Sequence, residues 1–138
     1  MTMKPTTSIS KIGVAELFGH IRDLSPLRVI QVTGPSVFET ICELDSFSIA
    51  DGWFNAITSQ YHWHLQLECF RQITTCDTIH ERSGRRVLFF ELRQRPDEDP
   101  FLLIYLHRAK GQEFESNREE LFERLHGRCS QGALVESE

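Results

Sequence analysis

The sequence predicts an α+β fold in which an antiparallel β-sheet, arranged as a meander, is flanked by one N-terminal and one C-terminal helix. Two observations support this prediction: a helical pattern near each end of the chain, and a run of strand-like segments between them. Because the helices and strands are segregated, the strands are expected to pair antiparallel, without the βαβ crossovers of a parallel sheet. The 138 residues fit a single domain, 1–138, large enough to bury a core without disulfides.

The N-terminal helix is expected to run from Ser10, as its cap, to about Leu24. Apolar residues recur at spacings of three and four, which places them on one face of a helix. These residues are Val14, Leu17, Phe18, Ile21 and Leu24. Ser25 precedes Pro26, and the residue before a proline disfavours the helical conformation, so the helix is expected to end there.

Shorter segments follow this helix. Residues 27–32 and 53–57 are typical of strands because they are rich in β-branched and aromatic residues. Residues 37–44 favour a strand, although a helix is compatible with the same apolar pattern. Residues 45–52 are expected to form a loop or a broken edge strand.

The stretch from Tyr61 to Ala109 is the longest strand-like part of the chain. Side chains on a strand point alternately to its two faces, and residues 61–68 alternate between apolar and polar types. One face would carry Tyr61, Trp63, Leu65 and Leu67, and the other His62, His64, Gln66 and Glu68. This pattern indicates a strand with one buried and one wet face. Further strands are expected at 70–80, 87–92 and 101–106.

The last two of these strands are apolar on both faces. In residues 87–92 and 101–106, apolar side chains occupy odd and even positions alike. Helices can cover one face of a sheet in a small domain, and a second apolar face of this size is unusual in contact with water. We therefore expect the second face to meet another subunit, a ligand or more of the chain.

The C-terminal helix is predicted by a capping box, in which Ser116 is followed three residues later by Glu119. Leu121, Phe122 and Leu125 would lie on one side of this helix, which is expected to stop near Gly127. The tails, residues 1–8 and 130–138, are polar and are expected to be flexible.

Composition narrows the class of protein. The net charge of −5 argues against a nucleic-acid partner, which usually requires a basic face. No apolar run is long enough for a signal peptide or a membrane span, so a cytoplasmic protein is expected. The four cysteines match no redox or zinc-ribbon spacing and are interpreted as reduced, partly buried thiols.

His62 and His64 are the candidate site residues. Two imidazoles on one face of a strand can hold zinc or iron, or supply an axial nitrogen to a haem. A metal site needs a third ligand, and Glu68 is the nearest candidate. Taken alone, the pattern is more typical of a solvated histidine pair.

From Gly52 onward the chain resembles the haem-utilisation family of HutX/ChuX-type proteins, which is related to HemS-like haem carriers. The features that carry the resemblance are diffuse: Gly52-Trp53-Phe54-Asn55, His64 ahead of Val87-Leu88-Phe89-Phe90, the strand from Phe101 to Arg108, and the helix with Leu121-Phe122-Glu123-Arg124-Leu125. The resemblance implies a homodimer and a haem cleft with histidine ligation. His64 falls where the family places one haem-associated histidine, while a second family histidine would fall near Thr33.

The resemblance implies a haem-binding protein for intracellular haem storage or trafficking. His64 would ligate the haem iron, His62 would be its neighbour, and arginines would meet the propionates. Because Thr33 stands where the family has its second histidine, an alternative is a dimeric interaction module that has lost haem binding. A haem-degrading enzyme is a third and weaker hypothesis.

Overall fold

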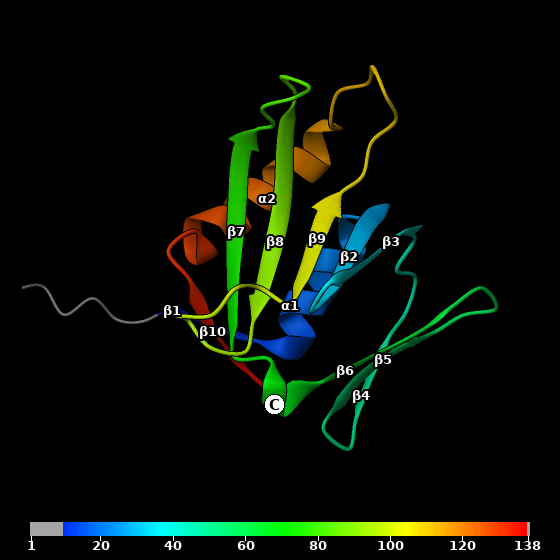
Figure 1. Cartoon of the computed structure of the whole chain (residues 1–138), viewed down its shortest axis with the longest axis vertical. Helices are drawn as coiled ribbons and strands as arrows, with labels where there is room; N and C mark the ends of the chain where they lie inside the picture. The colour runs from blue at the N-terminus through cyan, green and yellow to red at the C-terminus, as the bar shows by residue number, and fades with distance from the viewer. Residues whose placement is uncertain (1–9, 138) are drawn as a thin grey trace, which may run out of the picture.

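The computed structural model describes residues 10–137, which form a seven-stranded sheet, a three-stranded sheet and two α-helices (Figure 1). The strands are β1 (Ser10–Gly13), β2 (Leu27–Thr33), β3 (Ser36–Cys42), β4 (Ser48–Ala50), β5 (Trp53–Ile57), β6 (His62–Gln66), β7 (Gln72–Ile79), β8 (Arg86–Arg93), β9 (Leu102–Leu106) and β10 (Ala133–Glu136). The helices are α1 (Val14–Asp23) and α2 (Ser116–Cys129), and a short 3-10 turn, η1 (Leu67–Cys69), links β6 to β7. The predicted α+β class is confirmed. Neither α1 nor α2 is long and apolar enough to cross a membrane.

The large sheet has the strand order β1-β10-β7-β8-β9-β2-β3. Strands β7, β8 and β9 form the predicted antiparallel meander, and β2 pairs antiparallel with both β9 and β3. The prediction of one simple meander is wrong in two respects. Strands β4, β5 and β6 leave to form a separate sheet, and β1 pairs parallel to β10.

The two ends of the chain differ most from the sequence prediction. Ser10 does not cap a helix, because Ser10–Gly13 forms strand β1 and buries Ile12 beside β10. The expected flexible tail 130–138 contains β10, which lies between β1 and β7 and buries Ala133. These two end strands form mainly by pairing with each other, which no local pattern reveals. The N-terminal tail, 1–8, lies outside the described residues.

The caps of α2 also differ from the prediction. The N-cap is Glu115 rather than Ser116, and its side chain makes no capping hydrogen bond. The helix continues past Gly127 to Cys129, and Gly132 then turns the chain into β10 with a positive φ of 94°. A side chain is strained in that conformation, so glycine is favoured at this turn.

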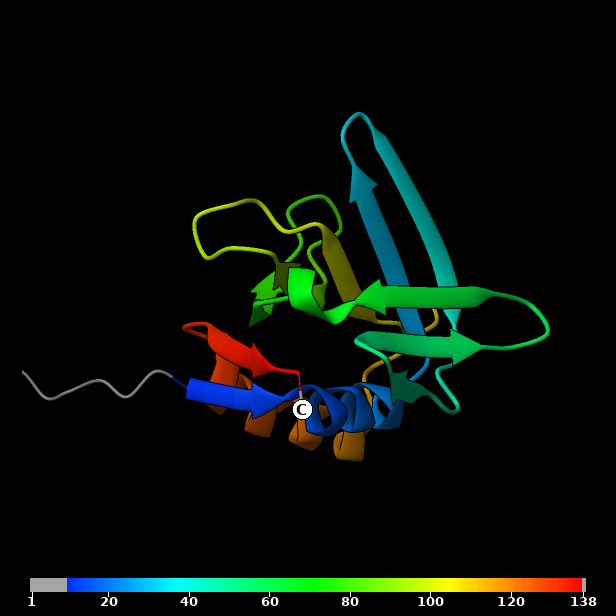
Figure 2. The same ribbon diagram turned by 90° about the horizontal axis from the view of Figure 1, so that it is seen from below.

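Both helices lie on one face of the large sheet (Figure 2). The β8 side chains Leu88, Phe90 and Leu92 point to this face and are fully buried. Phe90 meets Phe122 of α2 edge to face, with ring centroids 5.5 Å apart. This face of the sheet is therefore the main core of the protein.

Helix α1 joins the small sheet to this core. Phe18 on α1 stacks on Phe54 of β5 at 4.0 Å and meets Trp63 of β6 edge to face at 6.1 Å. The alternation predicted for β6 is confirmed, since Leu65 is buried and His64 is exposed. One buried aromatic side chain thus fixes the small sheet against the N-terminal helix.

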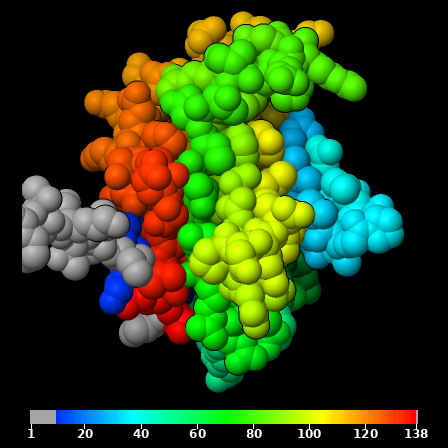
Figure 3. All heavy atoms as spheres, turned by 60° about the vertical axis from the view of Figure 1, so that its left-hand side comes forward, coloured from blue at the N-terminus to red at the C-terminus, as the bar shows by residue number. Residues whose placement is uncertain are grey.

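The opposite face of the large sheet is covered only in part. Phe89 on β8 stacks on Tyr105 of β9 with ring centroids 4.4 Å apart, and both remain half-buried. The hairpin of β2 and β3 projects beyond the body of the sheet (Figure 3). The second apolar face inferred from the sequence is present.

Candidate functional site

Two adjoining cavities lie between strand β2 and strand β6. The first has a volume of about 280 Å³ and the second about 230 Å³, and Gln31 and Trp63 line both. The first is also lined by Val32, Thr33, His64, Leu65, Gln94, Phe101 and Leu102. The second is also lined by Val29, Phe38, Thr40, Cys42, Gln60, Tyr61 and His62. We call the two cavities together the β2–β6 cleft.

His64 is held in a defined orientation at this cleft. The β5–β6 register places Asn55 opposite His64, and the His64 Nδ1 atom lies 2.7 Å from Asn55 Oδ1. Because a carboxamide oxygen can only accept, Nδ1 carries the proton and donates it. In the neutral ring the lone pair is then on His64 Nε2, which has no hydrogen-bond partner among residues 10–137. An imidazole fixed in this way through one nitrogen is the usual arrangement of a metal-ligating histidine.

His62 and His64 line different cavities of the cleft. Their ring centroids are 6.0 Å apart, and the rings are nearly perpendicular, at 85°. Glu68 lies in η1, beyond the end of β6, and accepts a hydrogen bond from Gln66 Nε2 at 3.2 Å. Within the part of the chain that the structure describes, no three His, Cys, Asp or Glu side chains converge. A site for a bare metal ion built from protein ligands alone is therefore not supported.

Thr33 and His64 line the same cavity, although they are distant in the sequence. Thr33 is the position near which the family's second histidine would fall. The structure therefore brings together the two positions that the resemblance singled out. In this chain one of them offers an imidazole and the other offers a hydroxyl.

Tyr61 and Cys42 are two neutral polar groups that line the smaller cavity. The Tyr61 hydroxyl donates to the Glu43 carbonyl at 2.7 Å, and burial, followed by the neighbouring Cys42, raises the pKa of Tyr61 to about 12. Burial likewise raises the pKa of the Cys42 thiol. Both groups stay protonated at neutral pH, so neither supplies an anionic ligand.

Sequence analysis missed several residues of this cleft. The pairing of Asn55 with His64 was not predicted. A signal for it was present, because residues 53–57 and 62–66 are separated by four residues, and a hairpin with a loop of that length can place Asn55 opposite His64. Gln31 and Gln94 had no recognisable signal in the sequence, because they reach the cleft from two segments far apart in the chain, strand β2 and the residues that follow β8. Arginines were expected to meet the haem propionates; among residues 10–137, no Arg or Lys lines either cavity.

No protein-family model matches the chain, and no curated protein matches it in sequence. Solved structures do match it. Protein AGR_C_4470 from Agrobacterium tumefaciens is 21% identical, with a TM-score of 0.66, and the match covers 80% of this chain and 63% of that one. The chain therefore spans somewhat less than two thirds of the length of that relative.

Two further structures are of proteins described as haem-binding. ChuX is 16% identical, with a TM-score of 0.68, and the match covers 83% of this chain and 70% of ChuX. PhuS from Pseudomonas aeruginosa is 18% identical, with a TM-score of 0.61, and the match covers 76% of this chain and 32% of PhuS. At such identities the likeness concerns the arrangement of the backbone. The chain has the fold of the ChuX-type haem-utilisation proteins.

Proposed function

We propose that this chain binds haem in the β2–β6 cleft, with His64 Nε2 as an axial ligand of the haem iron, and that it stores or transfers haem rather than degrading it. The observation that carries the proposal is the orientation of His64, which lines the larger cavity: its Nδ1 is held by Asn55, and its Nε2 has no hydrogen-bond partner among residues 10–137. The haem-binding descriptions of ChuX and PhuS, which share the fold, point in the same direction.

The lining of the cleft suits part of a porphyrin. Val32, Leu65, Phe101 and Leu102 offer apolar contacts beside His64. The larger cavity, about 280 Å³, lies just below the ~300–1,000 Å³ typical of cofactor sites, so it would enclose only one side of the macrocycle. When bound, haem would supply an iron centre that accepts the imidazole nitrogen. A half-enclosed haem can leave readily, which favours a role in transfer.

The test is a titration of the purified protein with ferric haem, followed by the Soret band. The wild type should give a saturable, red-shifted band, and His64→Ala should weaken binding by about tenfold or more. His80→Ala is a matched control, because His80 is an exposed histidine in the β7–β8 turn, remote in sequence from the cleft. Equal affinity of wild type and His64→Ala would overturn the assignment of the ligand. Absence of any saturable band would overturn haem binding itself.

Asn55 provides a second, more specific test. Asn55→Leu removes the acceptor for His64 Nδ1 and leaves the imidazole in place. Loss of such an orienting partner typically costs ~10–100-fold in metal affinity. We expect Asn55→Leu to weaken haem binding and to alter the Soret spectrum. A spectrum and affinity identical to those of the wild type would show that the orientation of His64 is irrelevant.

We also propose that the chain forms a homodimer through the β3 edge of the large sheet. Strand β3 is the last strand of this sheet, and its Val37 and Ile41 are 59% and 50% exposed on one face. An edge strand with exposed apolar side chains readily pairs with another chain, and two-fold pairing of identical edges satisfies both copies.

Sedimentation at micromolar concentration tests the dimer. The double variant Val37→Lys with Ile41→Lys should be a monomer, because like charges would meet across the two-fold axis. Ile79→Lys is the matched control, since Ile79 is 59% exposed at the end of a different strand, β7. A monomeric wild type, or a double variant that still dimerises, would contradict this interface.

A further inference from the structure

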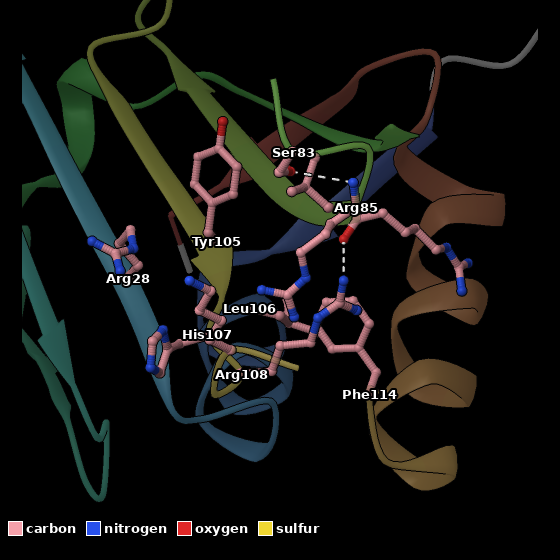
Figure 4. Close-up of a pocket in the computed structure, with 11 residues that line it drawn as sticks. Arg28, Ser83, Arg85, Tyr105, Leu106, His107, Arg108 and Phe114 are labelled. Atoms are coloured by element: carbon pink, nitrogen blue, oxygen red, sulfur yellow. Dashed lines mark hydrogen bonds between the residues drawn. The ribbon is translucent and has the colours of Figure 1, made fainter. Parts of the chain in front are cut away.

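A basic pocket lies away from the β2–β6 cleft, where β8 begins and β9 ends. It has a volume of about 430 Å³, and β2, the β7–β8 turn, β9 and the segment leading into α2 contribute to it (Figure 4). Its cationic lining consists of Arg28, Arg85, Arg86, Arg108 and Lys110, together with His107. These are five of the 15 Lys and Arg residues of a chain whose net charge is −5. We call this cavity the arginine pocket.

Two of these cations are neutralised by carboxylates. Arg86 pairs with Asp77 at 2.7 Å and also with Glu119. Arg28 pairs with Glu39 at 3.2 Å. These two arginines need no further anion.

The other three cations have no such partner. Among residues 10–137, no carboxylate oxygen lies within 4 Å of the side-chain nitrogens of Arg85, Arg108 or Lys110. Arg85 donates instead to the Gln112 carbonyl at 3.2 Å. The charges of these three residues are available to a ligand.

Arg108 is held in place before any ligand arrives. Its Nη2 donates to the Arg86 carbonyl at 2.7 Å, and its guanidinium lies 3.8 Å from the centroid of the Phe114 ring. Burial lowers the pKa of Arg108, and the positive charge of Arg85 lowers it further, while the carboxylate of Glu113 opposes this shift only in part. The pKa of His107 is also lowered, by burial and then by Arg28. Positive charge is thus concentrated here with only partial compensation, and an anion would relieve the repulsion.

Apart from Ser83, the remainder of the lining is largely apolar. Val87, Tyr105, Leu106 and Phe114 contribute aliphatic and aromatic surface. Figure 4 shows the Phe114 ring beside the Arg108 guanidinium, with Tyr105 rising from β9 on another side of the pocket. A ligand that fills this space therefore combines oxyanions with a flat apolar body, since a guanidinium matches phosphate or carboxylate groups with paired donors.

We propose that the arginine pocket binds a small organic polyanion, namely a flat ring that carries two or more phosphate or carboxylate groups. Arg85, Arg108 and Lys110 bind the oxyanions, and Val87 and Phe114 contact the ring. This site is separate from the β2–β6 cleft, because the two share no lining residue.

The experiment uses the full chain and four probes at low ionic strength: adenosine diphosphate, benzene-1,3,5-tricarboxylate, pyrophosphate and adenosine. Calorimetry gives affinities, and amide chemical shifts locate the site. At least one of the two ring-bearing polyanions should bind, and whichever binds more tightly identifies phosphate or carboxylate as the preferred group. Pyrophosphate, which lacks a ring, should bind more weakly than adenosine diphosphate, and adenosine, which lacks charge, should not bind. The shifts should fall on residues 83–87 and 105–114 and spare residues 62–65.

Variants test the role of each charge. Arg108→Gln should weaken binding by about tenfold or more, because it removes a charge-assisted contact. Lys110→Gln should weaken it as well, and this exposed residue carries little risk for folding. Arg95→Gln is the control, because it makes the same charge change on an exposed loop residue that does not line the pocket.

Three outcomes would overturn the proposal. The first is that neither ring-bearing polyanion binds with a Kd below ~10 mM. The second is that Arg108→Gln and Lys110→Gln bind as tightly as Arg95→Gln. The third is that saturation with the bound polyanion lowers the apparent affinity for ferric haem. That result would show that the polyanion and haem compete for one site.

Discussion

Removing the guanidinium of Arg118 should destabilise the protein more than any other single charge deletion on α2. Arg118 is 4% exposed, and its Nε and Nη2 donate to the Leu24 carbonyl at 3.1 and 2.8 Å. Nη2 also donates to the Pro26 carbonyl at 3.0 Å. Leu24 is the C-cap of α1, so the positive charge sits at the negative end of that helix. One side chain of α2 therefore ties the end of α1 to the start of β2.

The expected loss of stability depends on which backbone carbonyl is left without a hydrogen-bond donor. The Pro26 carbonyl keeps the His107 backbone N–H at 2.9 Å, whereas the Leu24 carbonyl loses both of its bonds to Arg118. A buried acceptor left unsatisfied costs about 1–3 kcal/mol, and the loss of the charge at the helix end adds up to about 1 kcal/mol. We expect Arg118→Met, which keeps most of the aliphatic stem, to lower the free energy of unfolding by about 1–4 kcal/mol.

Urea unfolding at pH 7, followed by tryptophan fluorescence and circular dichroism, measures this change. Arg118→Lys should fall between the wild type and Arg118→Met, because an ammonium keeps the charge but not the planar fork. Arg124→Met is the matched control on the exposed side of α2 and should stay within about 0.5 kcal/mol of the wild type. If Arg118→Met is as stable as Arg124→Met with an unchanged m-value, the hydrogen bonds to Leu24 do not stabilise the protein and the reasoning is refuted.

Three further predictions concern individual groups. The hydrogen bond from Arg86 lowers the pKa of Asp77, so the ionised carboxylate stabilises the protein at neutral pH, and this stabilisation is lost as the pH falls below about 4. In Asp77→Asn, the free energy of unfolding should depend less on pH in the acid range. An unchanged slope would contradict this expectation. Burial raises the pKa of Cys76 to about 11, which leaves a thiolate fraction of ~10⁻³ at pH 8. Peptide mapping should find that Cys76 is alkylated at least ~100-fold more slowly in the folded protein than in the protein unfolded by urea. Equal rates would show that burial does not raise the pKa of this thiol. Thr33→His places a second imidazole at the cavity of His64, so ferric haem should become six-coordinate and bind more tightly; a spectrum like that of the wild type would count against the shared cavity.

The candidate site was predictable only in part. The alternation over residues 61–68 predicted that His62 and His64 share a polar face, and the structure exposes both. The alternation could not show that His64 meets Asn55, because that contact depends on the pairing of β5 with β6. Nor could it show that the two histidines line different cavities, because other walls of those cavities come from distant segments: β2 in both, β3 beside His62, and residues 94 and 101–102 beside His64.

The local sequence alone determined those helices and strands that form because of the periodic spacing of their own apolar residues. The apolar spacing of α1 and the double-sided apolar pattern of residues 87–92 follow from helix and strand periodicity, and both are present in the structure. Tertiary structure alone decided which strands share a sheet, because strand pairing joins residues far apart in the chain. The parallel pairing of Ser10–Gly13 with Ala133–Glu136 and the meeting of Arg85 with Arg108 are both of this kind. Side-chain periodicity specifies which face of an element is buried, whereas its partner is set by the packing of the whole chain.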